Sequence, residues 1–362
     1  MTAPFRCFAA ALTLAALTLT ATGPAAAQDV TLKLHYFLPE TSFVPANILT
    51  PWADRIEAES GGRIKIDRYA SMALGGKPTD LADQVTDGVA DIVWTLPGYT
   101  PGRYPRTEVV ELPFMSADPG ATSAALWSMA QGWQDSDFKG VHLLGIWVHG
   151  PGVIHSGKPV EKLSDMAGLK LRAPSRAASM LMEKAGAAPI GMPVPAVPEA
   201  LSRGVIDGAL LPWEVTSSVR IDEFVSNHTE FDGRAVYTAV LMLAMNKAVY
   251  DGLPDDLKAV IDNASGADFS RIAGATQWTG DAAPRAAAAE GGANIVTLNA
   301  EQAAEWHALG DAVITEWAAA AQGFDGAALV AEARAAIAKA EAEAPATDAA
   351  TDAPALTEPA KP

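Results

Sequence analysis

The stretch Gly168-Leu169-Lys170-Leu171-Arg172-Ala173-Pro174-Ser175 decides the fold. Its two leucines alternate with Lys170 and Arg172, which is the period of a half-buried strand. Pro174 ends that strand, because the residue before a proline is pushed toward extended backbone and proline suits a first helical turn. Arg172 is therefore predicted at the carboxyl end of a strand, the edge where open α/β sheets bind ligands. A guanidinium there matches a carboxylate with two donors, and an ion pair with a surface acid is the alternative.

The residues that follow predict a helix and a second strand. The segment 198–203 is interpreted as a short helix that Gly204 ends, and 205–211 as a strand leading into Pro212-Trp213-Glu214. The combined pattern GLKLRAPS…EALSRGVIDGALLPWEV resembles the signature region of periplasmic solute-binding proteins of TRAP (tripartite ATP-independent periplasmic) transporters, the DctP family. The resemblance extends from about Val30 to Trp317.

This resemblance implies an α/β, two-lobed periplasmic-binding-protein fold with a central ligand cleft and a long helix that bridges both lobes. In the family, the arginine of this segment pairs with the ligand's carboxylate, a role that carries over to Arg172. The first lobe is expected to comprise residues 28–149 and about 237–275, and the second 150–236 and about 276–330. The implied partners are a small organic acid and the membrane subunits of a TRAP permease.

The two ends of the chain differ in composition from the rest. Residues 1–27 are predicted to be a secretory signal peptide, with Arg6 before an apolar run and Ala25-Ala26-Ala27 before the cleavage point. The single cysteine, Cys7, lies inside it, so the mature chain is expected to have no disulfide. From about residue 342 to 362 the chain is rich in Ala, Pro, Thr and acids, which predicts a disordered tail. We expect a periplasmic monomer.

The charge balance limits the possible partners. The chain carries 43 acidic and 26 basic residues, a formal net charge of −17. Such a surface argues against nucleic acid and anionic membranes as partners, and no stretch of the mature chain is long and apolar enough for stable membrane insertion. An anionic ligand must therefore be held by locally placed positive groups.

Aromatic residues follow several predicted strands at the edge that faces the cleft. Trp94, Trp147 and Trp213 each lie at a strand end, and Tyr99 lies on the turn-rich loop after Trp94. Core packing is the alternative for any single tryptophan. Aromatic walls can bury an apolar or aromatic ligand body, or hold a cation. We expect these four residues to surround the ligand.

Two polar residues complete the candidate site. His149 at the crossing between lobes, and Asn246 at the end of a long strand over 236–246, are candidate polar contacts. For His149, a hinge role with satisfied hydrogen bonds is the alternative. Sugar-acid binders of the family have Asn-Pro where this chain has Leu211-Pro212, and a second arginine where it has Gly152. A ligand with one carboxylate and an apolar or aromatic body, or a 2-oxo or 2-hydroxy acid, is therefore favoured over a dicarboxylate.

Other function classes have less support in the sequence. Nucleophile, phosphate-loop, zinc-protease and calcium-loop motifs are missing, and the six histidines lack metal-ligand spacing, so no catalytic residue, metal or cofactor is predicted. A secreted hydrolase or isomerase that uses the same cleft is the alternative reading. A binding protein that serves a membrane sensor rather than a permease is another.

Overall fold

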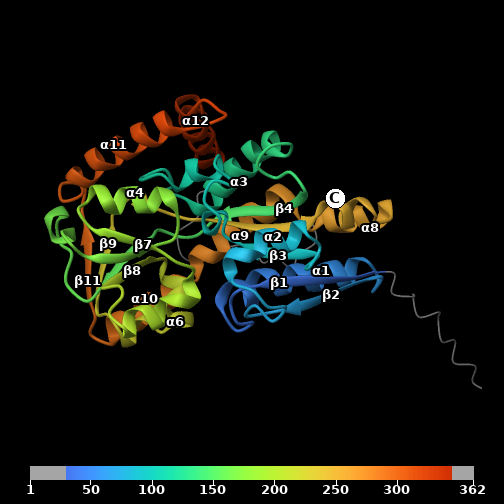
Figure 1. Cartoon of the computed structure of the whole chain (residues 1–362), viewed down its shortest axis with the longest axis horizontal. Helices are drawn as coiled ribbons and strands as arrows, with labels where there is room; N and C mark the ends of the chain where they lie inside the picture. The colour runs from blue at the N-terminus through green and yellow to red at the C-terminus, as the bar shows by residue number, and fades with distance from the viewer. Residues whose placement is uncertain (1–29, 345–362) are drawn as a thin grey trace, which may run out of the picture.

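The computed structural model describes residues 30–344, and it divides them between two lobes that are each built on one sheet (Figure 1). The predicted signal peptide and residues 345–362 of the predicted tail lie outside the described residues. Within the described range no helix is long and apolar enough to cross a membrane.

The first lobe has a five-stranded sheet in the order β2-β1-β3-β10-β4. β1 pairs in parallel with β2 and β3, while β10 returns from the other lobe and runs antiparallel to both β3 and β4. Val, Ile, Leu and Met dominate these strands because helices cover the sheet. The strands are Val30–Tyr36 (β1), Ile64–Tyr69 (β2), Ile92–Thr95 (β3), Val141–Val148 (β4) and Val240–Asn246 (β10). The helices of this lobe are Thr50–Glu59 (α1), Leu81–Thr86 (α2), Pro119–Ala130 (α3), Lys247–Asp251 (α7), Asp255–Asn263 (α8) and Gly266–Thr279 (α9), with short helical turns at Pro45–Leu49, Pro78–Asp80, Pro97–Tyr99 (η3), Thr107–Glu111 (η4) and Gln131–Trp133.

The second lobe has a six-stranded sheet in the order β11-β9-β5-β8-β6-β7. β6 lies parallel to β7 and β8, whereas β5 runs antiparallel to β8 and β9. The strands are Val153–Ser156 (β5), Lys170–Ala173 (β6), Ala188–Gly191 (β7), Gly208–Leu211 (β8), Asn227–Phe231 (β9) and Asn294–Leu298 (β11). The helices are Arg176–Lys184 (α4), Val197–Ser202 (α5), Trp213–Val219 (α6), Ala282–Glu290 (α10) and Ala304–Ala320 (α11), with short turns at Leu163–Met166, Val194–Ala196 (η7) and Ile221–Glu223.

The predicted strand–helix hand-over after Arg172 is present, with a refined boundary. β6 ends at Ala173, and α4 begins at Arg176 rather than at the proline. The side chain of Ser175 caps α4 by accepting a hydrogen bond from the amide of Ala178. The sheet therefore presents its carboxyl edge, with Arg172 on it, next to a helix N-terminus.

The helical connection between the lobes is made by two helices instead of the one long helix expected. α9 packs on α3 and β4 of the first lobe, and α10 packs on α6 of the second. Gly280 separates them, and a Cβ at this position would lie 2.8 Å from the ring of Phe43. A larger residue at this position would have to displace the ring of Phe43.

The last two helices cross back over the molecule along one side of both lobes (Figure 1). α11 packs on α4 of the second lobe. The final helix α12 (Gly326–Glu343) packs on α3 of the first lobe. Residues 342 and 343 are therefore helical, which corrects the start predicted for the tail.

Candidate functional site

Arg172 is held by backbone carbonyls at the carboxyl edge of the second sheet. The residue is 1% exposed. Its Nε donates to the carbonyl of Met192 at 2.9 Å and its Nη1 to that of Leu210 at 2.8 Å. Among the described residues its buried Nη2 has no hydrogen-bond partner, although the guanidinium lies close enough to the Tyr99 hydroxyl to oppose the rise of that group's pKa. Because an unsatisfied buried donor is costly, this nitrogen is prepared for an acceptor that arrives with a ligand.

A narrow cavity lies against Arg172 between the two lobes. Its volume is about 30 Å³, counted as the space that the centre of a water molecule can occupy. Of the described residues that line it, Arg172 is the only basic one apart from a histidine, and most of the wall is apolar. The residues that line it come from both lobes and from α9: Phe37, Leu38, Trp94, Leu96, His149, Arg172, Pro174, Val194, Leu211, Pro212, Glu214, Val215, Ala239, Leu241 and Gln277. One cation facing an apolar wall suits a ligand with one carboxylate and an apolar body.

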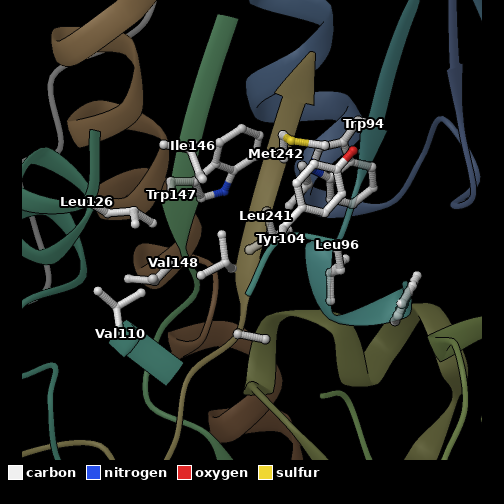
Figure 2. Close-up of a cluster of buried hydrophobic side chains, with 14 of the residues drawn as sticks. Trp94, Leu96, Tyr104, Val110, Leu126, Ile146, Trp147, Val148, Leu241 and Met242 are labelled. Carbon is white, nitrogen blue, oxygen red and sulfur yellow. The ribbon is translucent and has the colours of Figure 1, made fainter. Parts of the chain in front are cut away.

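Trp94 forms part of this wall, as the sequence suggests. Its ring stacks on Phe37 with centroids 4.6 Å apart, and its indole Nε1 is buried without a partner. In Figure 2, Trp94 and Trp147 lie on opposite sides of the strand that carries Leu241 and Met242. The first lobe therefore contributes a flat aromatic surface together with Leu241.

Tyr99 lies beside the cavity and joins the lobes. Its ring meets the edge of Phe37, and its hydroxyl accepts a hydrogen bond from the backbone amide of Val194 at 3.0 Å. Tyr99 also lines a larger neighbouring cavity of about 390 Å³ that shares Pro174 with the first. Its place is thus at the rim of the cleft, where η3 of one lobe meets η7 of the other.

Trp147 does not line the cavity itself but contacts it through Gln277. Its Nε1 donates to Oε1 of Gln277 at 2.8 Å, and the amide nitrogen of Gln277 donates to Oε1 of Glu214. Trp147 itself is fully buried against Phe269. Gln277 and Glu214 line the cavity, and Trp147 holds Gln277 in position by its hydrogen bond.

Glu214 and Gln277 were not among the site residues predicted from the sequence. Glu214 is 5% exposed, and burial raises the pKa of its carboxyl group to about 7, opposed by the hydrogen bond from Gln277. A signal for Glu214 was present, because an acid three residues after an apolar strand lies at the same ligand-binding edge as Arg172. Gln277 had no such signal, since it reaches the cavity from α9, far away in sequence.

Trp213 faces away from the cavity, contrary to the expectation. Its Nε1 donates to Oε1 of Glu230 at 2.7 Å, and its ring packs edge-on against His155. It lines a separate hollow of about 270 Å³ between α6 and α10. Because α6 begins at Trp213, the next residue, Glu214, points to the cleft instead, and Leu211 and Pro212 supply the apolar wall.

His149 contributes its ring to the cavity wall but offers no free nitrogen. Its Nε2 accepts from the amide of Ala239 at 3.0 Å, so its Nδ1 carries the proton and donates to the carbonyl of Gly150 at 2.6 Å. Burial lowers the pKa of His149 to about 4, which keeps the ring neutral. These contacts agree with the alternative role of His149 as a hinge residue. The hydroxyl group of Thr238, on the second crossing between the lobes, also donates to the His149 carbonyl.

Asn246 lies at the opposite edge of the first sheet. Its side-chain amide donates to the carbonyl of Val85 at 2.7 Å, and its Oδ1 accepts from the amide of Val249 as the cap of α7. The strand β10 is antiparallel to its neighbours, so its carboxyl end lies away from the cleft and its beginning, at Val240, lies near it. Asn246 therefore drops out of the candidate site.

Gly152, where sugar-acid binders of the resembled family carry a second arginine, has no space for a side chain. A Cβ there would lie 2.0 Å from the ring of Tyr237. The amide of Gly152 donates to the Tyr237 carbonyl at 3.0 Å, which holds the two crossings together. The second cation is thus excluded by packing.

Comparison with known proteins points to one family. Residues 36–320 match the model of the bacterial extracellular solute-binding proteins, family 7, known as DctP. A crystal structure of a TRAP solute-binding protein from Rhodoferax ferrireducens T118, in complex with copurified benzoate, is 47% identical with a TM-score of 0.85, and the match covers 87% of this chain and 100% of that one.

Two further relatives extend this comparison. A marine metagenome TRAP solute-binding protein specific for aromatic acid ligands, crystallised with 3-hydroxybenzoate, is 42% identical with a TM-score of 0.85, and the match covers 87% of this chain and 99% of that one. The C4-dicarboxylate-binding periplasmic protein DctP of Rhodobacter capsulatus is 25% identical over 304 residues, which cover 80% of this chain and 87% of that protein.

Proposed function

Because this chain belongs to the bacterial extracellular solute-binding proteins of family 7, the DctP family of TRAP transporters, we propose that it captures an aromatic monocarboxylate in the periplasm and delivers it to a TRAP permease. The single observation that carries the ligand class is the free Nη2 of Arg172 at one end of an apolar, aromatic cavity. Relatives crystallised with benzoate and 3-hydroxybenzoate support the same class.

The carboxylate would accept a hydrogen bond from Nη2 of Arg172, and its charge would neutralise the buried guanidinium. The ring would lie against Trp94, Leu241 and Leu211. Burying an aromatic ring in such a wall contributes through the removal of apolar surface from water and through stacking. Among the described residues the lining holds no second cation, which disfavours C4 dicarboxylates, and it is mostly apolar, which disfavours sugar acids.

The lobes would close over the ligand by hinge motion at the paired crossings around His149 and Thr238. Several contacts of the described residues join the lobes across the cleft, among them the following two at its rim. Tyr99 bonds to the Val194 amide, and Arg176 of α4 forms an ion pair with Glu108 of η4. Closure excludes water, which strengthens the pairing between Arg172 and the carboxylate.

The change of Tyr99 to phenylalanine tests the closure contact. We expect Tyr99→Phe to weaken ligand binding about 5- to 10-fold, because a typical hydrogen bond contributes about 1 kcal/mol and this one is made only when the lobes meet. Isothermal titration with benzoate measures the effect. Tyr69→Phe, at the end of β2 in the same lobe, is a matched control and should bind as the wild type does. An unaltered affinity in Tyr99→Phe would remove Tyr99 from the closure mechanism.

A thermal-shift screen of the mature protein tests the proposed function. Benzoate, hydroxybenzoates and mandelate should raise the melting temperature, whereas succinate, galactonate and ectoine should not. A ligand at 100 times its dissociation constant adds about 2.7 kcal/mol of stability, which such a screen detects. A shift only with dicarboxylates or sugar acids, or with none of these compounds, would contradict the proposal.

A further inference from the structure

The hydrogen bonds that hold Glu214 have a fixed direction. An indole nitrogen only donates, so Trp147 determines that Oε1 of Gln277 is the acceptor in their contact. The amide nitrogen of Gln277 must then be the group that faces Glu214, whose Oε1 accepts from it. The backbone amide of Glu214 is held in turn by Oδ1 of Asp281 at 2.8 Å. The carboxyl group is thereby fixed in position at the cavity wall.

The second oxygen of Glu214 is left for a ligand. Among the described residues no hydrogen bond reaches Oε2, and this atom keeps accessible surface although the residue as a whole is 95% buried and lines the cavity. If the carboxyl group is ionised, Oε2 is an acceptor. If it is protonated, the proton must be on Oε2, because Oε1 is occupied as an acceptor, and Oε2 is then a donor. In both states Glu214 offers one hydrogen bond to the cavity.

Glu214 and Arg172 are two separate polar groups in the lining of the cavity. Arg172 bonds to the Met192 and Leu210 carbonyls, whereas the Glu214 carboxyl group bonds to Gln277. The positive charge of Arg172 contributes to the lowered pKa of His149 but is not among the causes that act on Glu214, where burial is the largest. Apolar side chains such as Leu241 and Val215 line the remaining space.

We propose that Glu214 is a specificity-determining residue, which hydrogen-bonds a hydroxyl group on the ring of an aromatic acid whose carboxylate is bound by Arg172. This inference rests on the proposed function and narrows its ligand class to hydroxylated aromatic acids. A phenolic hydroxyl is both donor and acceptor, so it pairs with either state of Oε2. Benzoate would leave Oε2 buried and unpaired, and sites that hold an unpaired polar group reject such analogues.

Isothermal titration with benzoate, 3-hydroxybenzoate and 4-hydroxybenzoate, at one pH, tests the proposal. The wild type should bind the better hydroxybenzoate isomer about 10-fold or more tightly than benzoate, from the typical cost of one unpaired buried group. In Glu214→Leu this ratio should fall to about one, because benzoate no longer faces an unpaired oxygen. Glu214→Gln keeps the shape and one donor toward the cavity, so it should retain part of the preference.

The ratio of affinities separates specificity from a structural role. A merely structural Glu214 would lower both affinities equally and leave the ratio unchanged in both variants, which would overturn the proposal. Glu223→Leu, the same replacement on an exposed turn of the same lobe, should keep the wild-type ratio. If Glu214→Leu fails to fold, Glu214→Met is the second apolar replacement, and a wild-type ratio in that variant overturns the proposal by itself.

Failure of the inference and failure of the proposed function give different results. Tight binding of benzoate by the wild type, with no gain for either hydroxybenzoate, would overturn the role of Glu214 and leave aromatic acids as the ligand class. Binding of none of the three acids would overturn both.

Discussion

Replacing Arg172 with alanine is expected to abolish carboxylate binding. Among the described residues that line the cavity, the guanidinium is the only group with a fixed positive charge, and its unpaired Nη2 is the donor that we propose for the ligand. Truncating one partner of a buried, hydrogen-bonded charge pair costs about 2–5 kcal/mol, or about 30- to several thousand-fold in affinity. Isothermal titration with benzoate measures this loss.

The same replacement will also affect stability, which must be measured separately. An arginine that only faced a cleft would be dispensable for folding. The structure instead places Arg172 in full burial, with its Nε and Nη1 bonded to the Met192 and Leu210 carbonyls, so alanine leaves two acceptors unpaired. We therefore expect a lowered melting temperature in Arg172→Ala, from a loss of about 1–3 kcal/mol for each buried group left unsatisfied.

Arg172→Lys is the control that separates charge from geometry. Lysine keeps the positive charge but has no planar fork, so it cannot bond two carbonyls and the ligand in the same arrangement. We expect it to retain weak binding, between the wild type and Arg172→Ala. Wild-type affinity in a folded Arg172→Ala variant would remove the central claim about this site.

Replacing Glu111 with glutamine is expected to stabilise the protein at alkaline pH. Glu111 lies at the end of η4 and is 1% exposed. Its Oε1 accepts from the Val240 amide at 2.8 Å, while its Oε2 is buried without a partner. Burial raises the pKa of this carboxyl group to about 8, and the hydrogen bond from Val240 opposes the shift.

The sign of the pH dependence follows from the direction of this shift. A carboxyl group whose pKa is higher in the folded than in the unfolded chain favours folding while it is protonated. Its contribution is complete below pH 4.5 and is lost as the pH rises to about 8. Between pH 5 and 8.5 the loss amounts to about 4 kcal/mol, since one unit corresponds to about 1.4 kcal/mol.

Urea unfolding of the wild type and of Glu111→Gln at pH 5 and pH 8.5 checks this expectation. Glutamine keeps the acceptor for Val240 and has no proton to lose, so the variant should exceed the wild type in free energy of unfolding mainly at pH 8.5. Glu305→Gln, an exposed change on α11, should follow the wild type at both pH values. An equal difference between Glu111→Gln and the wild type at the two pH values would contradict the role assigned to the buried charge.

The sequence by itself predicted the family, the two-lobed α/β fold and the strand-end position of Arg172. These predictions depend on local pattern: alternation of Leu169 and Leu171 with basic residues, a proline that ends the strand, and a short motif shared with the family. Ligands bind at the carboxyl ends of parallel strands, and β3 is parallel to β1. This rule predicted that Trp94, at the end of β3, lies beside the cavity, which it lines.

Only the tertiary structure decided the rest of the site. Asn246 was misplaced because the direction of β10 relative to β3 is set by a long-range crossing and not by the strand's own residues. Trp213 was expected at the cleft, but Glu214 faces it instead, because one step along a helix turns the side chain by about 100°. Gln277 lines the cavity from α9, 63 residues after Glu214 in the sequence. The hydrogen bond that it accepts from Trp147 determines that its amide nitrogen faces Oε1 of Glu214 and leaves Oε2 for a ligand. Side-chain facing and hydrogen-bond direction depend on contacts between distant segments, which no local pattern records.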